Sequence, residues 1–217
     1  MRADLLALME SMVRDELDRL STDDESVALD LALHRYDRDR PRKLVKDVLS
    51  DGSDSLPLPD GWEDESELVS VEYPIGNLPV SLLTATIYTA PAGQVLRIGD
   101  ALPVDASARC TFTVRHVVDD VMDTVRASHR EGVAAYAAAL LLEELAAASI
   151  NEGDSTIHAD TTDRRTKAQE YASRARALKS RYADALGLVK DGEPAPASGA
   201  AVTWGGRPRL THGIRRG

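Results

Sequence analysis

The sequence predicts an α+β protein: mainly a helical bundle with a small inserted antiparallel β-sheet and an extended C-terminal tail. Three observations predict this class. Two alanine-rich segments, Glu131 to Ile150 and Thr162 to Leu186, have the composition of a helical hairpin. Residues between 69 and 118 contain the period-two alternation of β-strands. Residues from 190 onward are rich in Pro, Ala, Gly and Ser and bury too little to fold alone.

The N-terminal region has the apolar spacing of two helices. In the first, apolar side chains form one stripe: Leu5, Met9, Met12, Val13, Leu17 and Leu20. Thr22 and Glu25 have the spacing of a capping box, which predicts the start of the second helix. Its apolar side consists of Leu29, Ala32, Leu33 and Tyr36. Pro41 lacks an amide hydrogen and restricts Arg40, so we expect this helix to end near Asp39.

A long loop is predicted for residues 51–72. They carry eight acidic side chains and no basic one, and Pro57, Pro59 and Gly61 interrupt regular structure. Trp62 is the expected anchor of this loop. Carboxylates and carbonyls suit Ca²⁺, but the acids lack the spacing of an EF-hand. A solvated loop, or an acidic wall that repels DNA phosphates, is the favoured interpretation.

Three strands are expected next. Val80 to Thr89 is apolar and β-branched on both faces, which predicts a strand covered on both sides. Gln94 to Ile98 is expected to pair with it after the turn at residues 90–93. In the last strand, alternate positions are mostly apolar: Ala108, Cys110, Phe112, Val114 and His116.

The helical hairpin follows the strands, and Gly187 is a plausible C-terminal cap for its second helix. Small side chains let two helices approach closely and leave little bulk for building a pocket, which favours an assembly component over an enzyme. We therefore expect four regions: N-terminal helices (1–50), an acidic loop and β insertion (51–118), the hairpin that completes the bundle (119–189), and a tail for partner docking (190–217).

No residue set in the sequence indicates catalysis, and we expect no catalytic residue, metal site or cofactor. The histidines, none of which lies in an HExxH motif or at zinc-ligand spacing from the single cysteine, are His34, His116, His129, His158 and His212. His116 is expected to be packed or hydrogen-bonded. Glu143 and Glu144 point about 100° apart on a helix and cannot readily share a metal or proton. Asp119 and Asp120 are expected to begin the turn or helix after the strand.

The last predicted helix is rich in basic side chains: Arg164, Arg165, Lys167, Arg174, Arg176, Lys179 and Arg181. A basic helix can hold phosphates. Acidic residues are interleaved, however, and Glu170 lies four residues before Arg174, a favourable helical pair. A salt-bridged or inter-subunit face is therefore the favoured interpretation, and a nucleic-acid site the alternative.

The tail combines basic and apolar side chains that are typical of interface anchors. We expect it to dock on a partner protein, with phosphate contact as a lesser option, through Trp204, Arg207, Arg209, Leu210, Ile214, Arg215 and Arg216. A disordered or vector-derived end is the alternative. The tail is basic, whereas the whole chain has a net charge of −10.

Composition argues against several other classes of protein. An overall acidic chain is a poor free-standing nucleic-acid binder. No apolar run is long enough to predict a membrane span, and the acidic N-terminus does not resemble a secretion signal. Cys110 is the single cysteine, so no intrachain disulfide can form, which fits a reducing compartment.

The order of these parts resembles the head–tail connector (adaptor) proteins of tailed bacteriophages. The resemblance spans roughly residues 1–189, and its motifs are structural rather than catalytic. It is carried by ALDLALHRYDRDRP (28–41), LPDGW (58–62), VEYP (71–74), EGVAAYAAALLLEELAA (131–147) and DRRTKAQEYASRARALKSRYADALG (163–187). The tail beyond Lys190 lies outside the resemblance.

The resemblance implies a structural virion protein in the neck, present in the host cytoplasm during assembly. Such proteins form a ring, typically dodecameric, below the portal protein and above a tail or stopper protein. DNA passes through the ring without specific binding, and no membrane is involved. In such adaptors a C-terminal extension commonly docks against the portal. The alternatives are a tail-completion or stopper protein and a nucleic-acid-binding regulator, with an enzyme in fourth place.

Overall fold

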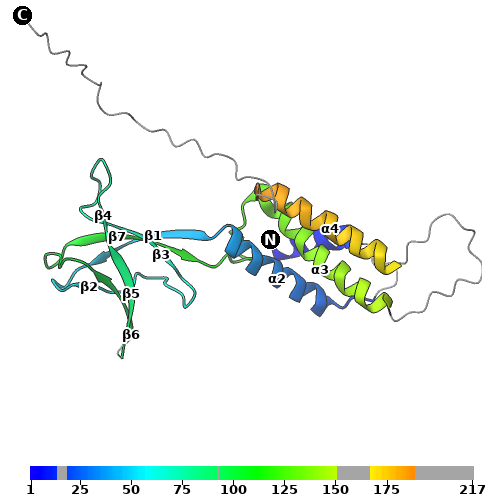
Figure 1. Ribbon diagram of the computed structural model, residues 1–217, viewed down its shortest axis with the longest axis horizontal. Helices are drawn as coiled ribbons and strands as arrows, with labels where there is room; N and C mark the ends of the chain where they lie inside the picture. The colour runs from blue at the N-terminus through cyan, green and yellow to red at the C-terminus, as the bar shows by residue number, and fades with distance from the viewer. Residues whose placement is uncertain (14–18, 92, 151–166, 189–217) are drawn as a thin grey trace, which may run out of the picture.

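The computed structural model describes residues 1–13, 19–91, 93–150 and 167–188, and it shows two modules side by side (Figure 1). The helical module contains α1 (Arg2–Val13), α2 (Thr22–Asp39), α3 (Arg130–Ile150) and α4 (Lys167–Leu186). The β module lies between α2 and α3 in the sequence. Its strands are β1 (Arg42–Leu49), β2 (Ser55–Leu56), β3 (Leu68–Glu72), β4 (Leu82–Leu83), β5 (Ala85–Ala90), β6 (Gly93–Ile98) and β7 (Ser107–Val114).

The α+β class is as predicted, but the expectation of a mainly helical bundle with a small inserted sheet is wrong. The described chain contains four α-helices and seven strands, and the strands form two antiparallel sheets with their own hydrophobic core. The strands extend beyond the predicted insertion because β1 lies within residues 1–50, where only helices were expected. The segment 51–72, predicted to be a loop, also contains β2 and most of β3.

Helix α3 is the centre of the helical module, and α1, α2 and α4 pack around it (Figure 1). From Val133 to Ala139 its side chains are buried on almost every side, with Tyr136 only partly exposed, and Leu141 and Leu142 continue this buried stretch. The predicted stripes of α1 and α2 face this helix: Leu5, Met9 and Val13 of α1, and Leu29, Ala32, Leu33 and Tyr36 of α2 are buried. Leu17 lies outside the described residues.

The ends of α2 follow the prediction closely. The capping box forms one position earlier than expected: Ser21 accepts from the Asp24 backbone N–H at 3.2 Å, and the Asp24 carboxylate accepts from the Ser21 N–H at 2.9 Å. Ser21 and Asp24 have the same hydroxyl-to-acid spacing as Thr22 and Glu25, so they form the same reciprocal pair of bonds one residue earlier. The helix ends at Asp39, before Pro41, as expected.

Small residues bring α3 and α4 close together at one end of the hairpin. A Cβ added to Gly132 would lie 2.9 Å from the Ala185 Cβ atom and 3.7 Å from the Tyr182 Cα atom. Two ion pairs also join these helices: Arg181 with Glu131, next to Gly132, and further along α3 the Lys179 Nζ atom with the Glu143 Oε1 atom at 2.7 Å. Gly187, with φ of +62°, follows the end of α4 as the predicted cap.

The two sheets have the strand orders β1-β7-β3-β4 and β2-β6-β5, and all described pairings are antiparallel. Thr84 alone separates β4 from β5, so one continuous stretch of chain forms an edge of both sheets. The core between the sheets is aliphatic and contains Val48, Leu56, Val71, Leu96, Ile98, Leu102, Ala108 and Cys110. Trp62 packs beside the Phe112 ring, with centroids 5.4 Å apart, which agrees with its expected role as anchor.

Two of the strand predictions are confirmed and one is wrong. Residues 107–114 form β7 with the expected buried side, and β6 pairs with β5 after the predicted turn. The segment from Val80 to Thr89, however, is not covered on both sides: Val80, Leu82, Ile87 and Tyr88 are exposed. Apolar residues on both faces indicate a covered strand, but the described chain contains no element that covers this one.

Gly132→Leu should destabilise the fold by about 1–3 kcal/mol, because a larger side chain overpacks the contact with α4 where only a glycine fits. Urea denaturation followed by circular dichroism would measure the change. Ala147→Leu, at an exposed position of the same helix, is the matched control and should change stability by no more than about 0.5 kcal/mol. Equal effects of both substitutions would contradict the close-packing explanation.

Candidate functional site

Two adjoining clefts lie where the helical module meets the β module. The first, of about 740 Å³, is lined by α2, by Tyr136 and Leu140 of α3 and by the end of β7. The second, of about 680 Å³, extends from α2 to the segment that follows β7. Four residues line both clefts: His34, Asp37, Glu65 and Arg115.

Polar groups around these clefts bond mainly to one another, and one of these bonds joins α2 to the segment that follows β7. The Asp37 Oδ1 atom accepts from the His116 backbone N–H at 2.7 Å. The Arg115 guanidinium pairs with Glu65 at 2.6 Å, and the Arg115 backbone N–H donates to Glu63 at 3.1 Å. These bonds connect α2 and the acidic segment to the end of β7. The Asp37–His116 bond fastens the two modules together, and no nucleophile is paired with a base among these residues.

His116 is hydrogen-bonded, as predicted, but it follows β7 rather than lying within the strand. Its Nε2 atom is 2.9 Å from the Arg40 carbonyl oxygen, and its Nδ1 atom is 3.0 Å from both the carbonyl and the hydroxyl oxygen of Thr124. Its ring packs against that of Tyr36, with centroids 4.6 Å apart. His116 therefore ties together the two chain segments that connect the modules.

His129 has a related structural role beside the same tyrosine. Burial, with Arg126 as a second cause, lowers the pKa of His129, which favours the neutral imidazole. The Nδ1 atom lies 2.9 Å from the Tyr36 hydroxyl oxygen and in that form can accept a hydrogen bond from the hydroxyl. The hydroxyl of a buried tyrosine is thereby satisfied.

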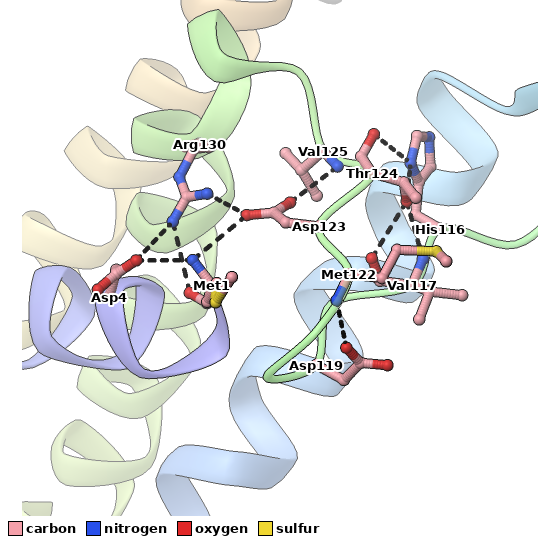
Figure 2. Close-up of polar contacts among 10 residues, drawn as sticks. All are labelled: Met1, Asp4, His116, Val117, Asp119, Met122, Asp123, Thr124, Val125 and Arg130. Atoms are coloured by element: carbon pink, nitrogen blue, oxygen red, sulfur yellow. Dashed lines mark hydrogen bonds and ion pairs between the residues drawn. The ribbon is translucent and has the colours of Figure 1, made fainter.

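The segment after His116 is a turn held by carboxylates, as Figure 2 shows. The Asp119 Oδ1 atom accepts from the backbone N–H groups of Val121 and Met122 at 2.7 and 2.5 Å, and these bonds lower the pKa of Asp119. This confirms that Asp119 begins a turn. Asp123 pairs with Arg130 of α3, and Arg130 also lies 3.6 Å from Asp4 of α1 (Figure 2). The turn is thus fixed to two helices.

The described residues contain no group of three or more His, Cys, Asp and Glu side chains that could hold a metal ion. Glu143 pairs with Lys179 rather than sharing a site with Glu144. Cys110 is buried in the β module, and burial raises the pKa of its thiol to about 11. The thiolate required for nucleophilic or metal chemistry is therefore scarce at neutral pH.

The predicted docking residues Trp204, Arg207, Arg209, Leu210, Ile214, Arg215 and Arg216 lie outside the described residues, as do Arg164 and Arg165 of the predicted basic helix. The basic residues described in α4 are largely engaged within the protein. Arg174 donates to the Met12 and Val13 carbonyls rather than pairing with Glu170 as expected. Lys179 and Arg181 form the ion pairs with α3 described above.

The clearest exposed apolar surface lies on the β module and was missed by the sequence analysis. No charged residue occurs between Tyr73 and Leu96, although 29% of the chain is charged. Within this charge-free segment, Leu78 is 94% exposed and Leu82 61% exposed. The length of this uncharged run was the available signal, because edge strands are usually protected by charged side chains.

Among the described residues, one helix is apolar and long enough to cross a membrane by length and composition alone. It comprises Ala127–Ser149, and 67% of its most apolar 18-residue window is buried inside the protein. This is weak support for a membrane span, because a core helix meets the same criteria. Comparison with known proteins gives no further assignment: no protein-family model matches the sequence, and no curated protein is significantly similar to it.

Asp37→Asn should make the protein more stable than wild type at neutral pH and leave it nearly unchanged in acid. Burial raises the pKa of Asp37 above its usual 3.8, so the folded wild type loses stability as pH rises through that raised pKa. Asparagine resembles the protonated acid and can still accept from His116. Urea denaturation of both proteins at several pH values from neutral to acidic would measure the difference in their free energies of unfolding.

Asp47→Asn is the matched control for this prediction. The pKa of Asp47 is lowered by its hydrogen bond to Arg109, so the native state favours the ionised form. Replacing this acid should reduce stability at neutral pH and have little effect below its pKa. The same sign of change for both variants at neutral pH would show that burial does not govern Asp37.

Proposed function

We propose that this protein is a structural component of the neck of a tailed bacteriophage: a head–tail connector (adaptor) that forms a ring between the portal and the tail and lines the DNA exit channel. The observation that carries the proposal is the charge-free segment 73–96, which exposes apolar side chains along the edge of a β module whose own core is already formed. Exposed apolar surface of this kind marks a site of protein association.

The helical module supports a structural role as well. Its central helix is packed with alanine and leucine, and its polar residues tie helices to one another. The Tyr182 hydroxyl donates to Asp39 at 2.7 Å, and Arg40 donates to the Leu186 carbonyl. Because Arg174, Lys179 and Arg181 are also engaged within the protein, α4 is less available for phosphate than its composition suggests. This favours the connector over a nucleic-acid-binding regulator.

The net charge of −10 fits a channel through which DNA moves. Acidic walls repel phosphates, so DNA can slide without specific binding. The partners of this proposal are other copies of the chain, a portal protein above the ring and a tail or stopper protein below it.

Electron microscopy and native mass spectrometry of the full-length protein, alone and mixed with the portal protein of the same genome, would test this function. We expect a ring bound coaxially to the portal. A protein that binds a preformed connector ring but not the portal would instead be a stopper. A compact monomer that binds neither component would contradict the proposal.

Removing residues 190–217 should abolish portal binding while leaving the body folded. The described helical core extends to Leu186 and Leu188, so the deletion leaves those packing contacts intact. Circular dichroism and thermal unfolding would check folding, and co-sedimentation with the portal would check binding. Replacing Trp204, Arg207 and Arg209 by alanine in the full chain is a milder variant. Portal binding at wild-type level by both variants would contradict tail docking.

A further inference from the structure

The two outer edges of the β1-β7-β3-β4 sheet differ in charge but both expose apolar side chains. Strand β1 carries Arg42, Lys43 and Lys46 and a single acid, Asp47, which is paired with Arg109 of β7 at 2.8 Å. Strand β4 and its flanking residues carry no charge. On β1, Val45 and Leu49 are 54% and 61% exposed. The edges are therefore unlike in charge and alike in having uncovered apolar surface.

Strand register places the apolar residues of both edges on one face of this sheet. Asp47 lies opposite Arg109, Arg109 opposite Glu72, and Glu72 opposite Leu82, so these four residues form one row across the four strands. Directly opposite residues point to the same face of a sheet. Val45 and Leu49, two residues either side of Asp47, share that face with Leu82.

The directions of the edge strands also fit each other. Four antiparallel strands in succession leave β1 and β4 running in opposite directions. A second copy in the same orientation, placed beside the first, would therefore bring its β1 antiparallel to β4. Such joining of two different edges is heterologous, and repetition around an axis closes into a ring.

We propose that neighbouring copies of this chain join through these edges, with the 78–83 segment of one copy against β1 of the next, so that the sheet continues from subunit to subunit. The proposal rests on the ring of the proposed function and specifies its contact. Backbone pairing would satisfy the free edge groups, and Leu82 would be covered beside Val45 or Leu49.

Charge favours this pairing over the contact of two β1 strands. A symmetric contact would place the basic residues of β1 near their own copies, where like charges oppose pairing. The uncharged edge brings no such repulsion. A symmetric contact between two charge-free edges carries no charge penalty either, and the experiment distinguishes it from the proposed one.

Cysteine cross-linking of the full-length protein tests the geometry. Val45→Cys and Leu82→Cys variants, purified separately and mixed under mild oxidation, should form a disulfide-linked dimer, whereas each variant alone should not. Val27→Cys, on α2 and 58% exposed, is the matched control and should not cross-link to Leu82→Cys. The native Cys110 is buried and should not contribute background.

Substitutions at Leu82 test the energetics. Leu82→Lys should weaken self-association on the order of tenfold, because it removes apolar burial and places a charge in the contact. Leu82→Met keeps an apolar side chain of similar volume, so it is the matched control and should associate nearly as tightly as the wild type. Sedimentation velocity over a concentration series would measure the association.

The outcomes separate this inference from the proposed function. Cross-linking of Leu82→Cys alone, equal to that of the mixture, would overturn it in favour of a symmetric dimer. Two results together would also overturn it while leaving the connector function intact: Leu82→Lys forms a normal portal-bound ring, and the Val45→Cys and Leu82→Cys variants form no mixed disulfide. Specific mixed disulfides in a protein that binds no portal would support the edge contact and contradict the connector function.

Discussion

The burial of α3 on nearly all sides is the constraint on which the rest of the structure depends. A helix surrounded by three others must present small side chains wherever a neighbour approaches closely, and Gly132 meets that demand against α4. Because α1, α2 and α4 each pack on this helix, the position of every other helix follows from it. The ends of α2 and α3 in turn determine where the β module is attached. Asp37 and His116 then fasten that attachment through a single short hydrogen bond.

The two modules differ in how much of their surface is left without an internal partner. The helical module pairs many of its described charged groups internally, including basic residues whose composition suggested a binding face. The β module also has an apolar core of its own, but both outer edges of its four-stranded sheet leave apolar residues uncovered. A surface of this kind is costly for an isolated chain and useful in an assembly, and this contrast is the strongest structural argument for a component of a larger particle.

The sequence was most informative where an element has one buried face. The stripes of α1 and α2 and the alternation in β7 follow directly from contact with a single core. The sequence pattern did not predict β1, because its charged residues interrupt the alternation of a strand that pairs on one side only. It also failed for residues 80–89: apolar composition indicates that a strand is covered but does not say whether the cover belongs to the same chain. The clefts could not be predicted because they combine residues from α2, β7 and α3 that only the fold brings together, and the tail residues lie beyond the described part.

The pairing of β1 with β7 has a consequence for how such a protein can change. Arg42 lies opposite Val114, so the chain leaves the helices and returns to them through two adjacent strands, roughly 5 Å apart. An insert with such closely spaced ends can grow, shrink or be exchanged while the helices keep their relative positions. The β module is in that sense a replaceable attachment, through which related proteins could acquire different partners on an unchanged helical frame.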